Sequence, residues 1–136
     1  MKNNKLVLLS AFLFALFGST AAYASPHAKK EINTAITHAS LAEKMSDVKQ
    51  VHLHLHHVIN CLVGPKGVGF DASAGNPCAG MGNGAINDYK ADKVDRDMLT
   101  QVLEDANYGL LTNRLQIARN AAQLAEKNLR KSEEDL

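Results

Sequence analysis

The chain has 136 residues, a formal net charge of +1 and 5% aromatic residues. A net charge so close to zero gives no electrostatic basis for binding nucleic acid. The supply of aromatic residues is too small for the core of a β-sandwich or barrel, and the abundant Ala, Leu, Val and Ile favour helices. We therefore expect a single all-α domain.

The first 24 residues have the pattern of a secretory signal peptide. Lys2 and Lys5 precede an apolar run over residues 6–17, and Ala22 and Ala24 match the small residues of a cleavage site. The apolar run is shorter than the about 20 residues that a membrane span needs. We therefore expect residues 25–136 to form an exported periplasmic domain that has no lasting insertion in the membrane.

Two helices are predicted between residues 25 and 63. Ser25 followed by Pro26 is typical of a helix start, and apolar residues then recur at helical spacing from 32 to 42. Ser46 and Asp47 suit a short turn that caps a second helix, although one uninterrupted helix is the alternative. The second helix is expected to stop at Gly64, which is followed by a proline. Its predicted apolar stripe is Val48, Val51, Leu55, Ile59 and Leu62.

A long loop and a second pair of helices are predicted after this point. Seven of the nine glycines lie between residues 64 and 84, so we assign residues 64–87 to a loop without helices. Helical spacing returns over residues 88–136, with a break expected at 107–109 and a new helix start near Thr112 and Asn113. The predicted architecture is an antiparallel four-helix bundle, in which the loop joins two hairpins at 25–63 and 88–136.

The two cysteines lie at the ends of this loop. Cys61 precedes it and Cys78 stands in its second half. In an oxidising compartment such a pair is more often a disulfide than a pair of metal-binding thiolates. We predict a Cys61–Cys78 disulfide that pins the loop.

The histidines are concentrated in one short tract, a composition typical of metal binding. On a helix, His52 and His56 lie one turn apart at one edge of the apolar stripe, whereas His54, His57 and Cys61 lie on a different face. A pair of histidines four residues apart can place two imidazoles on one ion, and the first helix could bring a further histidine to that edge. The candidate ligands for a copper, zinc or nickel ion are therefore His38, His52, His54, His56 and His57.

The same histidines allow interpretations other than a metal site. Leu53 occupies the position of the glutamate in the H-E-x-x-H motif, and the G-x-S-x-G, phosphate-loop and C-x-x-C-H motifs are absent, so we expect no enzyme. Noncovalent haem or another small ligand could use the same histidines inside a bundle. A helical envelope protein could present them to a partner, or they could simply border the core.

If they bind metal, affinity should fall as the pH drops through about 6.5, because the neutral imidazole is the ligand.

The stretch AITHASLAEKMSDVKQVHLHLHHVI, residues 35–59, resembles the repeats of small periplasmic histidine-rich metal-binding proteins of bacteria. In that family, helical units of the form A-x-x-H-A-x-x-A build a four-helix bundle that takes up divalent metals such as copper. The resemblance implies metal binding by the His-bearing hairpin of this chain. This chain departs from the family in its histidine-free second half and in its long loop with the two cysteines Cys61 and Cys78 at its entrance and near its end, which implies one or two defined sites near His38, His52 and His56.

Overall fold

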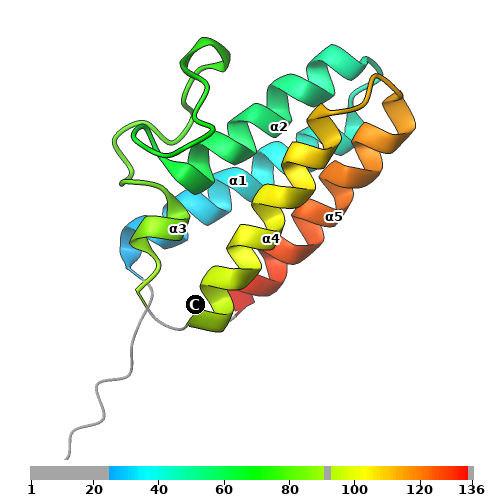
Figure 1. Cartoon of the computed structure of the whole chain (residues 1–136). Helices are drawn as coiled ribbons and strands as arrows, with labels where there is room; N and C mark the ends of the chain where they lie inside the picture. The colour runs from blue at the N-terminus through cyan, green and yellow to red at the C-terminus, as the bar shows by residue number, and fades with distance from the viewer. Residues whose placement is uncertain (1–24, 91–92, 135–136) are drawn as a thin grey trace, which may run out of the picture.

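The computed structural model describes residues 25–90 and 93–134, and the predicted signal peptide lies outside them. Over these residues the secondary structure is entirely helical, which confirms the all-α prediction. Four long helices form a bundle of two hairpins, and the loop between the hairpins projects from one side (Figure 1). No helix in this part of the chain is both long and apolar enough to cross a bilayer.

The first hairpin consists of α1 (Pro26–Lys44) and α2 (Val48–Val63). The Ser25 hydroxyl accepts a hydrogen bond from the backbone N–H of Ala28, and the carboxylate of Asp47 accepts one from the N–H of Lys49. Each bond satisfies an N–H group that would otherwise lack a partner in the first turn of a helix. The predicted turn at Ser46 is therefore confirmed, and the alternative of one uninterrupted helix is wrong.

The loop that follows α2 contains two short helices, so the prediction that it has none is wrong. A 3₁₀ turn, η1, spans Ala72–Ala74, and a single α-helical turn, α3, spans Ala85–Asp88. The Asp71 carboxylate starts η1 by accepting a hydrogen bond from the N–H of Ser73. Local side-chain bonds of this kind need no apolar periodicity, which explains why the sequence pattern did not reveal the turn.

The two ends of the loop meet. A Cβ atom on Gly64 would lie 2.0 Å from the carbonyl oxygen of Asn83, and one on Gly84 would lie 2.3 Å from the carbonyl carbon of Val63. Both glycines also have positive φ angles, 70° and 101°, which other residues rarely adopt. The loop therefore leaves the bundle and returns to it at one place, where only glycine fits.

The predicted disulfide is present. Cys61 and Cys78 are bonded, and both are buried in the core. Because Cys61 belongs to the last turn of α2, the bond ties the second half of the loop directly to that helix.

The second hairpin consists of α4 (Lys93–Leu110) and α5 (Leu115–Glu134). The break expected at residues 107–109 is wrong, because α4 continues through them. A Cβ atom on Gly109 would lie 2.6 Å from Leu55 Cδ1 and 3.0 Å from the Cβ atom of Ala121. This glycine therefore allows close packing of three helices and does not form a turn.

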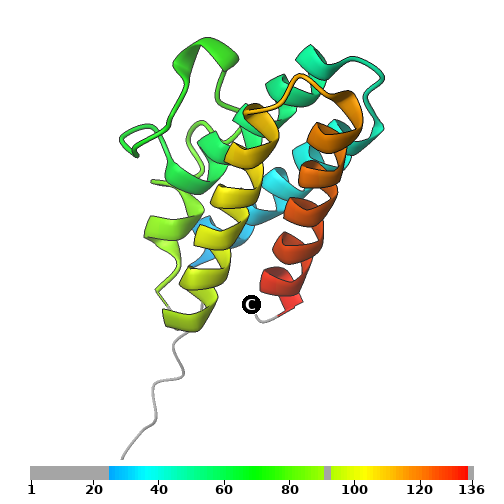
Figure 2. The same ribbon diagram turned by 45° about the vertical axis from the view of Figure 1, so that its right-hand side comes forward.

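The bundle encloses one core. α1 packs against α2 and α5, and α4 packs against α5 and α2, so each long helix has two principal neighbours (Figure 2). The predicted stripe of α2 points inward, with Val48 only partly buried at its start. The largest fully buried apolar side chains are Tyr89, Ile32, Leu55, Ile59, Leu62, Leu99, Leu129, Val51, Val58 and Val102.

Candidate metal centre

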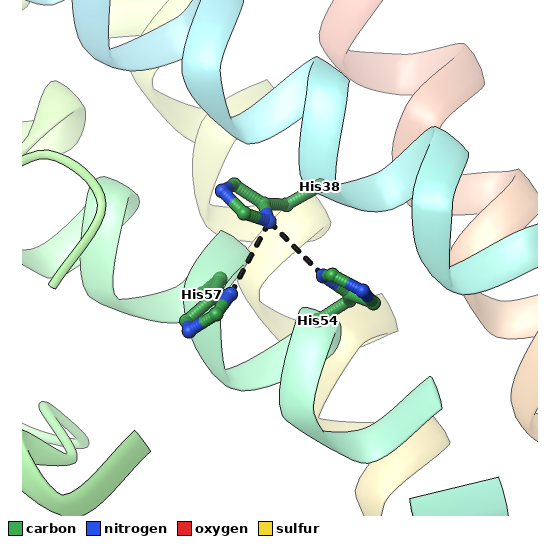
Figure 3. A group of neighbouring side chains, drawn as sticks. All are labelled: His38, His54 and His57. Carbon is green, nitrogen blue, oxygen red and sulfur yellow. Dashed lines mark hydrogen bonds between the residues drawn. The ribbon is translucent and has the colours of Figure 1, made fainter. Parts of the chain in front are cut away.

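Three imidazoles from two helices converge on one point. His38 projects from α1, and His54 and His57 project from α2 (Figure 3). The Nδ1 atom of His38 lies 3.1 Å from Nδ1 of His54 and 3.2 Å from Nδ1 of His57. Among residues 25–90 and 93–134, these three form the one group of at least three His, Cys, Asp or Glu side chains with the spacing of metal ligands.

The short turn between α1 and α2 creates this arrangement. It makes the two helices antiparallel neighbours, so His38 on α1 lies opposite the second and third turns of α2. His54 and His57 are three residues apart and therefore share one face of α2. The rings contact one another, with a centroid separation of 4.5 Å between His38 and His57 and 5.3 Å between His38 and His54.

The protonation site of His57 is fixed by the loop. Its Nε2 atom lies 2.7 Å from the carbonyl oxygen of Ala74. A carbonyl oxygen can only accept a hydrogen bond, so Nε2 must carry the proton. In the neutral ring, Nδ1 of His57 then carries a lone pair, and this lone pair faces the other two histidines.

Protons satisfy this cluster poorly. Each Nδ1 atom carries either one hydrogen or one lone pair in the plane of its ring. A hydrogen on His38 can reach the lone pairs of His54 and His57 only by dividing one bond between them. A metal ion, by contrast, accepts all three lone pairs at once. Zinc–nitrogen bonds of 2.0–2.1 Å at tetrahedral angles would place the nitrogens about 3.3 Å apart, close to the two separations in the structure.

Burial lowers the pKa of two of the three histidines. The pKa of His38 is lowered from 6.5 to about 4, first because burial disfavours the charged ring and then because of repulsion by His57 and His54. Burial, followed by repulsion from His57, also lowers the pKa of His54. Both shifts favour the neutral imidazole, which is the form that binds metal, and His38 keeps this form down to about pH 4.

His52 and His56 do not join the cluster. His52 donates from Nε2 to the carbonyl oxygen of Thr112, 2.9 Å away, in the turn between α4 and α5. Nδ1 of His56 lies 3.6 Å from a carboxylate oxygen of Asp71 in the loop. The expectation that His38 would approach the edge formed by His52 and His56 is therefore wrong.

The physical reason lies in the handedness of the bundle. The apolar stripe of α2 has two edges, and α1 can lie beside either of them in a four-helix bundle. In the structure α1 lies beside the edge of His54, while the edge of His52 faces the second hairpin. Helical periodicity defines both edges and does not distinguish them.

Two further residues belong to the site's surroundings and were not predicted. Ala74 contributes only its backbone carbonyl, for which the sequence carries no signal. Asn60 is fully buried and holds the loop through its side chain. The sequence does single out this residue, because Asn60 is the one amide side chain within the apolar run from Val58 to Val63. Cys61, which shares a face with the cluster, is bonded to Cys78 and so is not a metal ligand.

Comparisons with protein-family models, curated proteins and solved structures found no match for this chain.

Proposed function

We propose that this chain is an exported periplasmic protein that binds one transition-metal ion, copper, zinc or nickel, through Nδ1 of His38, His54 and His57. The observation that supports the proposal is the convergence of three Nδ1 atoms at separations of 3.1 and 3.2 Å, one of them with its lone pair held toward the others. Imidazole nitrogen suits these three metals. The disulfide is compatible with an oxidising compartment such as the periplasm.

The site fits a carried or buffered ion better than a structural one. Structural zinc ions usually have four protein ligands, whereas this cluster offers three. The core is also filled by apolar side chains and closed by a disulfide, so the fold does not need an ion to hold it together. A coordination position left open by the protein would let the ion exchange with another ligand.

Haem is a less suitable ligand for this cluster. The three rings contact one another, with a centroid separation of 5.7 Å between His54 and His57. A macrocycle between His38 and the other two rings would have to push α1 and α2 apart. We therefore propose ion binding, and the geometry gives no reason to add a catalytic role.

The test is a titration of metal-free protein, residues 25–136, with Cu(II), Zn(II) and Ni(II) by calorimetry. At least one metal should bind with a 1:1 ratio and a Kd of about 1 µM or tighter. His38→Ala, His54→Ala and His57→Ala should each weaken that binding by about 100-fold. The matched control is His52→Ala/His56→Ala, which removes two histidines from the same helix and should leave the affinity within about threefold.

Two results would contradict the proposal. One is the absence of any metal binding tighter than about 0.1 mM. The other is equal loss of affinity in the control and in the cluster variants, which would indicate nonspecific binding by a histidine-rich surface. A haem titration followed at the Soret band is the parallel measurement, and haem binding that depends on His38 without metal binding would favour the haem interpretation.

A further inference from the structure

The loop beside the cluster is held by one buried side chain. Asn60 donates from Nδ2 to the carbonyl oxygens of Asp71 and Gly75, at 2.8 and 2.6 Å, and its Oδ1 accepts from the N–H of Asp71 at 2.8 Å. All the hydrogen-bonding atoms of this amide are therefore engaged by the loop. Asn60 itself is completely buried, so water does not compete for these bonds.

The position of these bonds matters for the cluster. Asp71 and Gly75 stand on either side of η1, and Ala74, whose carbonyl accepts from His57, lies between them. His57 and Asn60 are three residues apart on α2, so they share one face of the helix. The same helix therefore carries both the ligand and the residue that places the loop carbonyl against that ligand.

We propose that Asn60 is a positioning residue of the metal centre. It fixes the carbonyl of Ala74, which keeps the proton of His57 on Nε2 and so makes Nδ1 a permanent lone-pair donor to the ion. This inference rests on the proposed function and goes beyond it, because it assigns the ligand atom and the residue that controls it. Loss of an outer partner of a metal-binding histidine typically weakens affinity by about 10- to 100-fold.

The first experiment measures the tautomer without metal. Long-range ¹H–¹⁵N spectra of the metal-free protein at pH 8 should show His57 with its proton on Nε2. In Asn60→Ala, this population should fall, and the affinity for the metal bound by the native protein should weaken by about 10-fold or more. The matched control is Asn87→Ala, because the Asn87 amide also ties the loop, to the carbonyls of Val63 and Asn83, but at its other end.

A second pair of variants covers the case in which Asn60→Ala does not fold. Gly75 and Gly80 are both exposed loop glycines with positive φ, 88° and 74°. Gly75→Ala strains the peptide that carries the Ala74 carbonyl, next to His57, and should reproduce both effects. Gly80→Ala imposes a similar strain where no atom lies within 4 Å, and should change neither the tautomer nor the affinity.

The outcomes separate this inference from the proposed function. A native His57 with its proton on Nδ1, or folded Asn60→Ala and Gly75→Ala proteins with native tautomer and affinity, would overturn the positioning role. If the native protein binds none of the three metals but its tautomer still depends on Asn60, the proposed function fails while the loop's control of His57 stands.

Discussion

The two hairpins use similar helices for different purposes. The first has helices of 19 and 16 residues and the second has helices of 18 and 20 residues. Every histidine of the chain precedes residue 58, so the second hairpin has none. The two hairpins are therefore similar in length, but the three converging histidines belong to the first alone.

Among the described residues of the second hairpin, Ser132 is the one buried polar side chain, and its hydroxyl donates to the carbonyl oxygen of Asn128 on the same helix. The ion pairs of this hairpin, Lys93 with Asp97 and Arg130 with Glu126, each join residues four apart on one helix. Such pairs typically add less than about 1 kcal/mol, so this hairpin depends on packing. The face of α5 that enters the core is rich in alanine, which lets neighbouring helices approach closely.

In the first hairpin, by contrast, polar side chains lie between the helices and beneath the loop. Three imidazoles are partly buried between α1 and α2, and one amide is fully buried beneath the loop. Burial of polar groups is tolerated where hydrogen bonds satisfy them, and the loop supplies such bonds to His57 and to Asn60. The loop therefore satisfies one of the three imidazoles and the buried amide of the first hairpin.

The largest expected effect comes from cutting the loop's covalent tie. The double variant Cys61→Ser/Cys78→Ser removes a bond between residues 17 apart in sequence and should lower the free energy of unfolding by about 3 kcal/mol. Urea denaturation followed by far-UV circular dichroism measures the change. Native protein unfolded in the presence of a dithiol reductant is the control and should lose a similar amount. A loss below about 1 kcal/mol would show that the first hairpin does not depend on the tie.

A smaller loss of stability is expected when a methyl group is added at Gly109 in the second hairpin. Gly109→Ala should lower the free energy of unfolding by about 1 kcal/mol, since the added methyl group would overlap Leu55 and Ala121. The sign of the change in the free energy of unfolding is informative, because replacing Gly by Ala at an exposed helix position would instead raise it by about 1 kcal/mol. Thermal and urea unfolding of Gly109→Ala and of the exposed neighbour Asn107→Ala provide the comparison. If Gly109→Ala is the more stable protein, the helices are not closely packed there.

An effect of similar size is expected from pH, and it belongs to the first hairpin. Unfolded His38 takes up a proton near pH 6.5 and folded His38 only near pH 4, so the stability present above 6.5 is lost progressively as the pH falls to 4. We expect a loss of about 1 kcal/mol, once solvent screening of the partly exposed ring is allowed for. The lowered pKa of His54 acts in the same direction.

The control for this prediction isolates the cluster. Burial raises the pKa of Glu31, which lowers stability as the pH rises and so opposes the effect of the histidines. The measurement is therefore the difference between native protein and His38→Ala/His54→Ala in urea unfolding at pH 7.5, 6, 5 and 4. Parallel pH profiles for the two proteins would contradict the assignment.

Local sequence signals predicted most of the fold. Ser25, Asp47 and Gly64 act within a few residues of themselves, so the start of α1, the start of α2 and the end of α2 were predicted correctly. Gly109 was misinterpreted because a glycine that breaks a helix and one that allows close packing are the same letter in a sequence.

The candidate site was only partly predictable. The histidine tract was recognised, but the choice between the edges of His52 and His54 depends on the handedness of the bundle, which is a property of all four helices. The role of Ala74 depends on a backbone carbonyl, which any residue could provide. Asn60 was the one outer residue that its side chain could have revealed.

Because Gly64 and Gly84 lie against each other, the loop between them is an insertion in the bundle. The bundle would remain continuous if these two glycines were joined directly, because their backbones already lie against each other. A chain shortened in this way would retain the three converging histidines and lose both the Ala74 carbonyl and Cys78. The three histidines thus belong to the four-helix scaffold, whereas the carbonyl that orients His57 belongs to an insertion in it.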